Sequence, residues 1–157
     1  MRKRKKKPET LPVNNVQFFH EVASAIANGH TVTITTHGTS MYPFIQGGID
    51  KLVLDAPTSL AVADIVLARL PQQEYVLHRI IRKEGNRLTL MGDGNLQATE
   101  SCRTSDVIAK VISIQHPKGA QFCQSARFRR QSRLWMHLLP VRRHLLAVLK
   151  RIRPIHS

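Results

Sequence analysis

Acidic residues are missing from both ends of this 157-residue sequence, and basic residues are concentrated there. Residues 2–7 carry six positive charges and residues 127–153 carry nine. Residues 8–126 hold nine Lys or Arg against ten Asp or Glu, a net charge of −1. A domain that binds duplex DNA usually carries its positive charge over the folded surface. The net charge of +14 therefore comes from the two basic ends of the chain, and we expect no specific nucleic-acid partner.

Cysteine is scarce, and long apolar runs are absent. The two cysteines, Cys102 and Cys123, have no metal-ligand spacing, and a reduced cytosolic setting is the default for such a chain. The histidines show no ligand spacing either, so we expect no metal and no other cofactor. The basic start resembles the charged part of a signal sequence, but polar residues interrupt the apolar run that should follow. No window approaches the roughly 18–20 apolar residues that span a bilayer, so we expect a cytoplasmic protein.

The chain divides into three parts by composition. Residues 1–12 form a charged arm that we expect to be disordered. Residues 13–120 should form one β-domain with a leading helix over residues 15–28, because apolar residues recur there at three- and four-residue steps and Asn28-Gly29 ends the pattern. Residues 127–155 form a basic, amphipathic helical tail, in which Pro140 should kink or divide the helix.

Short apolar runs separated by turn residues predict strands through the middle of the chain. Their spacing is typical of a mainly β fold, a small coiled barrel or sandwich with hairpin connections. The predicted strands cover residues 31–36, 51–54, 64–70, 75–82, 87–91 and 107–114.

The helical tail has an apolar stripe and a basic remainder, and three interpretations are open. The tail could lie on an anionic membrane surface, which would make the protein peripherally membrane-associated. It could instead pack its stripe on the β-domain and leave the arginines in water. As a third alternative, both basic ends could bind nucleic acid through phosphate contacts. The membrane interpretation assigns the surface to Arg133, Trp135, Arg142, Arg143 and Lys150.

Three short segments carry candidate catalytic residues, each at the end of a strand-like run. Ser40 lies between Gly38 and Pro43, and small, rigid neighbours can expose a serine on a tight turn. His78 follows in the segment Val76–Ile80, and Asp93 lies in Gly92-Asp93-Gly94-Asn95. A hydroxyl, an imidazole that can take its proton and an acid that can orient the imidazole are the parts of a serine nucleophile system.

These segments resemble the signal peptidase-like (S24/S26) superfamily of serine peptidases, in its Ser-His type, and among its members a small stand-alone bacterial protein. Residues 38–43 match the box Gly-x-Ser-Met-x-Pro, and residues 64–67 match the strand that follows it in the family. Residues 76–81 match the segment that contains the catalytic histidine, and residues 92–95 resemble the Gly-Asp-Asn-Asn box. The resemblance covers residues 31–114, and it implies the family's coiled β fold.

The resemblance also implies the roles of individual residues. Ser40 would be the nucleophile, His78 the general base and Asp93 the group that fixes the imidazole. The cleft and the oxyanion site would involve Gly38, Thr39, Met41 and Pro43, with the main-chain N–H of Ser40 as a donor. The substrate would be a leader or signal-type peptide with small side chains near the scissile bond. Activity should fall as acid protonates His78.

The sequence departs from the family pattern at the acid. A further acidic residue usually follows the Gly-Asp box, and here Glu100 is only an approximate substitute. Ser40 could also be a turn serine, His78 a core histidine and Asp93 a turn residue. The alternative function is therefore a catalytically inactive module that binds peptides or acts as a scaffold with the same fold.

Overall fold

The computed structural model describes residues 16–153, and the basic arm at residues 1–12 lies outside this range. It is mainly β, as the sequence predicts, with one helix before the strands and two after them. Eight antiparallel strands form one sheet in the order β1-β2-β7-β3-β4-β5-β6, and β8 pairs with β7 off this path. The strands are β1 (Val32–Thr35), β2 (Lys51–Asp55), β3 (Ile65–Arg69), β4 (Tyr75–Glu84), β5 (Arg87–Met91), β6 (Glu100–Arg103), β7 (Val107–His116) and β8 (Gly119–Phe122).

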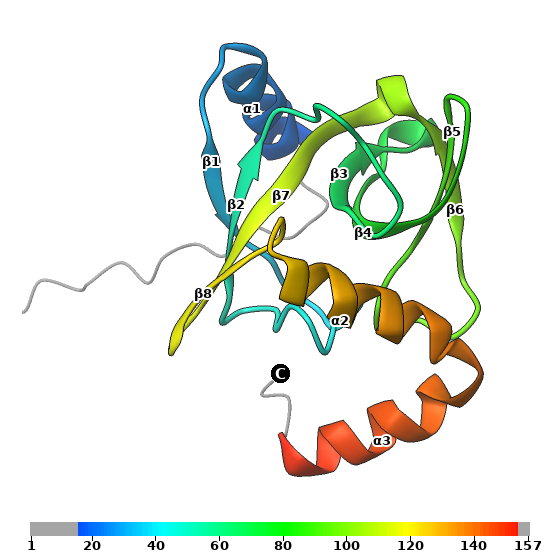
Figure 1. The fold of residues 1–157 in the computed structure, drawn as a ribbon. Helices are drawn as coiled ribbons and strands as arrows, with labels where there is room; N and C mark the ends of the chain where they lie inside the picture. The colour runs from blue at the N-terminus through cyan, green and yellow to red at the C-terminus, as the bar shows by residue number, and fades with distance from the viewer. Residues whose placement is uncertain (1–15, 154–157) are drawn as a thin grey trace, which may run out of the picture.

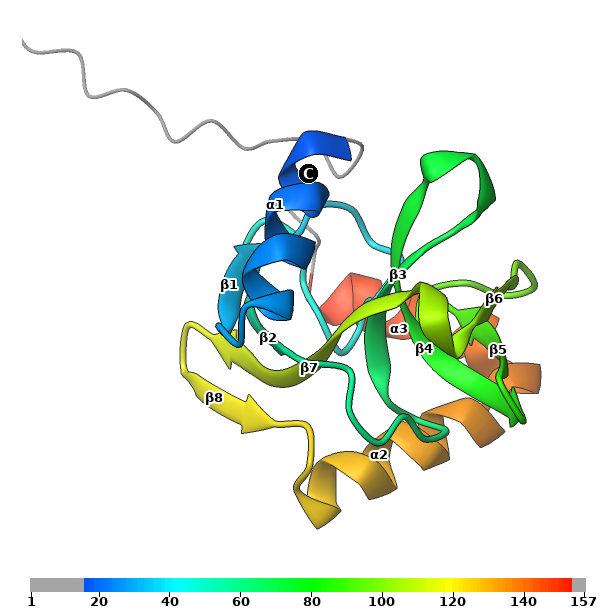
Figure 2. The same cartoon turned by 90° about the horizontal axis from the view of Figure 1, so that it is seen from above.

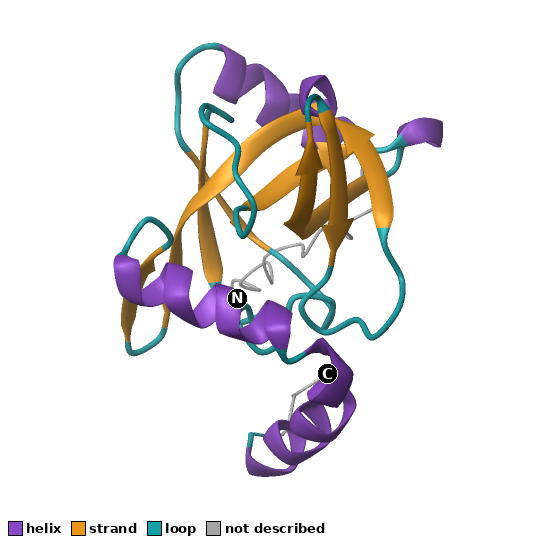
Figure 3. Cartoon of the chain, turned by 45° about the vertical axis from the view of Figure 1, so that its right-hand side comes forward, coloured by secondary structure: helices purple, strands orange, loops and turns teal. Residues whose placement is uncertain are grey.

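The sheet curls on itself, as Figure 3 shows for the strands seen together. The register shifts at three places, in the pairings of β2 with β7, β3 with β7 and β4 with β5. Such irregularities bend a strand and increase its twist. The curl encloses a small apolar core between β3, β4, β5 and β6, which includes Val66, Ile80, Leu88 and Leu90.

The first helix, α1 (Val16–Ala27), covers one open side of the sheet (Figure 2). Its buried residues are Phe19, Val22 and Ile26, so the predicted three- and four-residue spacing marks the face that packs. They join the largest core cluster together with Leu52 of β2 and Val111 of β7. This helix is one wall of the site described below.

The C-terminal helices α2 (Ala126–His137) and α3 (Arg142–Ile152) lie at the end of the molecule opposite α1 (Figure 1). Ser125 caps α2 by accepting a hydrogen bond from the Phe128 N–H. Pro140 divides the two helices, as predicted, within a 3₁₀ turn at Leu139–Val141. Two further 3₁₀ turns occupy Pro71–Gln73 and Thr104–Asp106.

Candidate active site

Ser40 lies in the segment that connects β1 to β2, and its side chain is exposed. Gly38, two residues earlier, has a φ of 84°, a left-handed conformation that glycine adopts without strain. The turn is closed by a hydrogen bond from the Tyr42 N–H to the Thr39 carbonyl. The glycine and the turn explain why the segment can present a serine to the surface.

The Gly92-Asp93-Gly94 box supports this serine segment through its backbone. The Gly94 N–H donates to the Ser40 carbonyl oxygen at 2.8 Å. A Cβ at Gly92 would collide with the Ser40 carbonyl oxygen, and one at Gly94 would collide with the Thr39 carbonyl oxygen. The box therefore needs glycine at both positions because the two backbones touch.

His78 lies on β4, and only 7% of the residue is exposed. Its Nδ1 is 2.7 Å from Oε2 of Glu100, the first residue of β6. The sheet order β4-β5-β6 brings the two residues together across β5. When Nδ1 donates its proton to a carboxylate, Nε2 is left as the basic nitrogen of a neutral imidazole.

Asp93 does not orient His78, contrary to the expectation from the resemblance. Its carboxylate accepts two hydrogen bonds from Arg79, from Nε at 2.8 Å and from Nη2 at 2.7 Å. Both side chains are almost wholly buried, and the guanidinium lies against the rings of Phe44 and Phe128. A bidentate acid compensates for the burial of the Arg79 guanidinium, so Asp93 is committed to Arg79, while the preceding residue of β4, His78, contacts Glu100.

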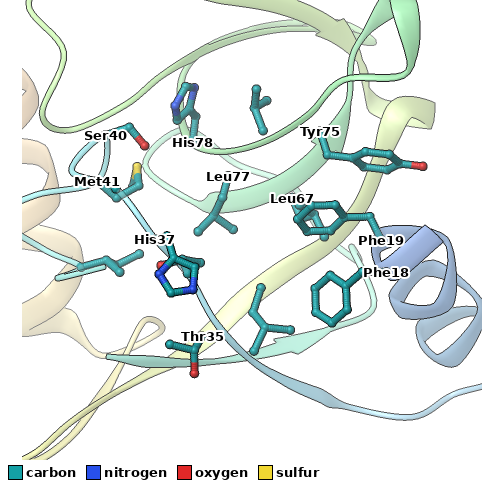
Figure 4. A pocket seen from close by; sticks show the side chains of 15 residues that line it. Phe18, Phe19, Thr35, His37, Ser40, Met41, Leu67, Tyr75, Leu77 and His78 are labelled. Atoms are coloured by element: carbon teal, nitrogen blue, oxygen red, sulfur yellow. The ribbon is translucent and has the colours of Figure 1, made fainter. Parts of the chain in front are cut away.

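Ser40 and His78 line the same pocket, a cavity of about 210 Å³. In Figure 4 the two side chains lie at one end of the view, with the Ser40 hydroxyl on the side that carries His78. Three aromatic rings, of Phe18, Phe19 and Tyr75, stand at the other end. A hydroxyl and an imidazole in one apolar pocket, with a carboxylate bound to the imidazole, are the parts needed to attack a carbonyl held in that pocket.

The predicted cleft residues divide into two groups. Gly38 and Met41 line the pocket together with their neighbour His37. Thr39 is exposed outside the lining, and Pro43 instead borders a separate hollow beside Asp50 and His116. The pocket residues of α1 and of the start of β4 are not predicted, because their apolar spacing is also that of ordinary core residues.

Two residues assigned to a membrane surface are buried instead. Trp135 is 7% exposed, and its indole N–H donates to the Asp93 carbonyl at 2.9 Å. Arg142 is 2% exposed and donates to the Asn95 carbonyl at 3.0 Å, and burial lowers the pKa of its guanidinium. Both side chains donate to carbonyls of the loop after β5, so they pack on the β-domain. Arg133, Arg143 and Lys150 are exposed, as expected.

The other nucleophiles and ligands do not compete with Ser40. Burial raises the pKa of Cys102 to about 11 and that of Cys123 to about 12, so both thiols stay protonated at neutral pH. Among residues 16–153, no group of three or more His, Cys, Asp or Glu side chains could hold a metal ion. Within the same range, no helix has the length and apolar character needed to cross a membrane.

Comparisons with known proteins identify no family. No family model matches the sequence, and no curated protein matches it.

Proposed function

We propose that this protein is a serine endopeptidase in which Ser40 is the nucleophile, His78 the general base and Glu100 the acid that orients the base. The observation that carries the proposal is the 2.7 Å contact between His78 Nδ1 and the Glu100 carboxylate, because His78 and Ser40 line the same pocket. The motif order and the curled sheet support the signal peptidase-like (S24/S26) family and its fold for residues 31–114.

The reaction follows from the chemistry of these three groups. His78 Nε2 accepts the Ser40 proton as the serine oxygen attacks the peptide carbonyl, and Glu100 stabilises the imidazolium that forms. The proton then passes to the leaving amine when the C–N bond breaks, which leaves an acyl-enzyme. Water, deprotonated by His78, releases the acid product and restores the serine. The main-chain N–H of Ser40 is a donor for the oxyanion.

The substrate we propose is an extended segment of a leader or signal-type peptide. Among the described strands, β1 pairs only with β2, and residues 75–78 of β4 pair only with β3. Both strands contribute residues to the pocket, so each offers it a free backbone edge. A peptide can add to such an edge as a further strand, where main-chain hydrogen bonds hold it regardless of most of its side chains.

The test is covalent labelling by a fluorophosphonate probe together with peptide cleavage. We expect the wild-type chain to be labelled and to cut peptides, and Ser40→Ala to lose both properties with its melting temperature nearly unchanged. Ser24→Ala is the matched control, because Ser24 is an exposed serine of α1 outside the pocket lining. A fully active Ser40→Ala variant would refute the assignment. A wild-type chain that binds peptides without labelling or turnover would support the inactive peptide-binding module instead.

A further inference from the structure

The pocket beside Ser40 continues well past the residues that the proposed chemistry uses. Beyond Ser40 and His78 its lining is mostly apolar, with Ile34, Leu67 and Leu77 from three strands and the aromatic rings from α1 and β4. In Figure 4 Leu77 and Leu67 lie between Ser40 and the aromatic rings. An apolar extension next to a nucleophile is a place for a substrate side chain.

The volume of the pocket indicates the size of the side chain that it can hold. A dry protein cavity of about 150 Å³ binds benzene, and this cavity is about 210 Å³. The methyl group of an alanine would leave most of the cavity empty. The side chains that line the empty part would then lack favourable dispersion contacts. A leucine, methionine or phenylalanine side chain would fill it.

The aromatic end of the pocket is held by packing. Phe19 stacks on Tyr75 with ring centroids 4.9 Å apart, and Phe18 meets Phe19 edge to face at 5.2 Å. Phe19 also belongs to the main core cluster. Because this wall is part of the core, it cannot collapse onto a small side chain without disturbing α1.

We infer that the pocket selects a bulky apolar residue, such as leucine, methionine or phenylalanine, near the scissile bond of the substrate. The inference rests on the proposed peptidase function, and it reverses the expectation of small side chains that came from the resemblance. In an extended peptide every second side chain points to the same face. One such residue enters the pocket while the backbone lies along the free edges of β1 and β4.

The first test is cleavage of a randomised peptide library by the full chain, read by mass spectrometry of the products. We expect leucine, methionine or phenylalanine at one position near the cut, with kcat/KM at least about tenfold above alanine there. Equal use of alanine, or a preference for alanine, would overturn the inference and leave the peptidase function intact.

Variants of residues that line the pocket test whether the pocket selects the substrate side chain. Leu77→Phe should narrow the pocket and reduce the leucine-over-alanine preference, whereas Phe18→Ala should widen it and shift the preference towards phenylalanine. Val16→Ala is the matched control, because Val16 is an exposed residue at the start of α1 outside this pocket and should leave the preference unchanged. If both wall variants fold and keep the wild-type preference, the pocket does not select the side chain.

Binding separates this inference from the proposed function. Fluorescence anisotropy of labelled peptides on the Ser40→Ala chain needs no turnover. Peptides with leucine or phenylalanine at the central position should bind at least about tenfold more tightly than the alanine peptide. This result would support the pocket inference even if no peptide is ever cut, and equal affinities would overturn it.

Discussion

Glu100 and Asp93 are carboxylates that contact successive residues of β4, His78 and Arg79, respectively. Glu100 contacts the imidazole from the edge strand β6 and is partly exposed. Asp93 is buried with Arg79 and binds no imidazole in this arrangement. The chemistry of the site should therefore depend on Glu100, and the stability of the fold should depend on Asp93.

Glu100→Gln should slow cleavage while the protein stays folded. The amide keeps the shape of the side chain but cannot stabilise the imidazolium, so we expect kcat to fall by about 10²- to 10⁴-fold. The melting temperature should change little, because the side chain is partly exposed. Steady-state kinetics and a thermal melt on the same preparation check both parts.

The contrasting variant is Asp93→Asn. Breaking a buried ion pair by changing one partner typically costs about 3–5 kcal/mol, so we expect a clear loss of stability in a denaturant titration. If Asp93→Asn instead kept its stability and lost only kcat, while Glu100→Gln stayed active, the assignment of the acid to Glu100 would be wrong.

Backbone contacts position the loop that contains Ser40, and the C-terminal helices α2 and α3 contact this loop and the loop after β5. Trp135 of α2 donates to the Asp93 carbonyl, and the Tyr42 hydroxyl donates to the Leu149 carbonyl of α3 at 3.2 Å. Tyr42, Trp135 and Leu146 form the buried cluster that joins the helices to the site loops. The helical tail is thus part of the structure that holds the loop of Ser40.

Gly94→Ala should disable the site by displacing the serine segment. The added Cβ would collide with the Thr39 carbonyl oxygen, which is backbone and cannot rotate away. We expect at least about a tenfold loss of kcat/KM, since small displacements of catalytic groups are costly.

Gly85→Ala is the matched control for Gly94→Ala. Gly85 has a φ of 58° in the turn between β4 and β5, with open space around it. Alanine there should cost about 1 kcal/mol of stability without moving the site. Equal activity losses in the two variants would show that lowered stability, and not the position of the serine segment, is the cause.

Burial and sheet order explain which parts of the structure the sequence could predict. Short apolar runs bounded by turn residues indicate β4 and β5 well, because the apolar residues of both strands are largely buried. The strands β6 and β8 are missed, because edge strands such as Glu100–Arg103 contain mostly polar and exposed residues. The pairing of Glu100 with His78 depends on sheet order, which local spacing does not encode. Helical periodicity also could not tell that Trp135 faces the domain while Leu134, one residue earlier, does not.

The whole molecule has an uneven distribution of charge and apolar surface. Several large apolar side chains of α2, α3 and the turn between them are exposed, including Leu134 at 60% and Ile152 at 70%. Residues 107–157 contain no Asp or Glu. The exposed cations of α2 and α3, with Arg153 just after them, are Arg127, Arg130, Arg133, Arg143, Lys150, Arg151 and Arg153.

Binding to an anionic membrane surface stays a prediction for this end of the molecule. The full chain should sediment with vesicles that contain phosphatidylserine and remain in solution with neutral phosphatidylcholine vesicles. Each basic residue near such a surface contributes about 1 kcal/mol. The charge reversal Arg143→Glu with Lys150→Glu should therefore weaken binding by at least about tenfold, and added salt should weaken it further.

The apolar contribution needs its own variant, because charge alone would also favour nucleic acid. Val148→Ser with Ile152→Ser should weaken vesicle binding, since both side chains are exposed on α3 and would enter the interface. Phe122→Ser is the matched control, because Phe122 is equally exposed but lies on β8. If the serine variants bind vesicles like the wild type, the helices do not insert apolar side chains. Salt-sensitive binding to duplex DNA without vesicle binding would instead favour phosphate contacts by the basic ends.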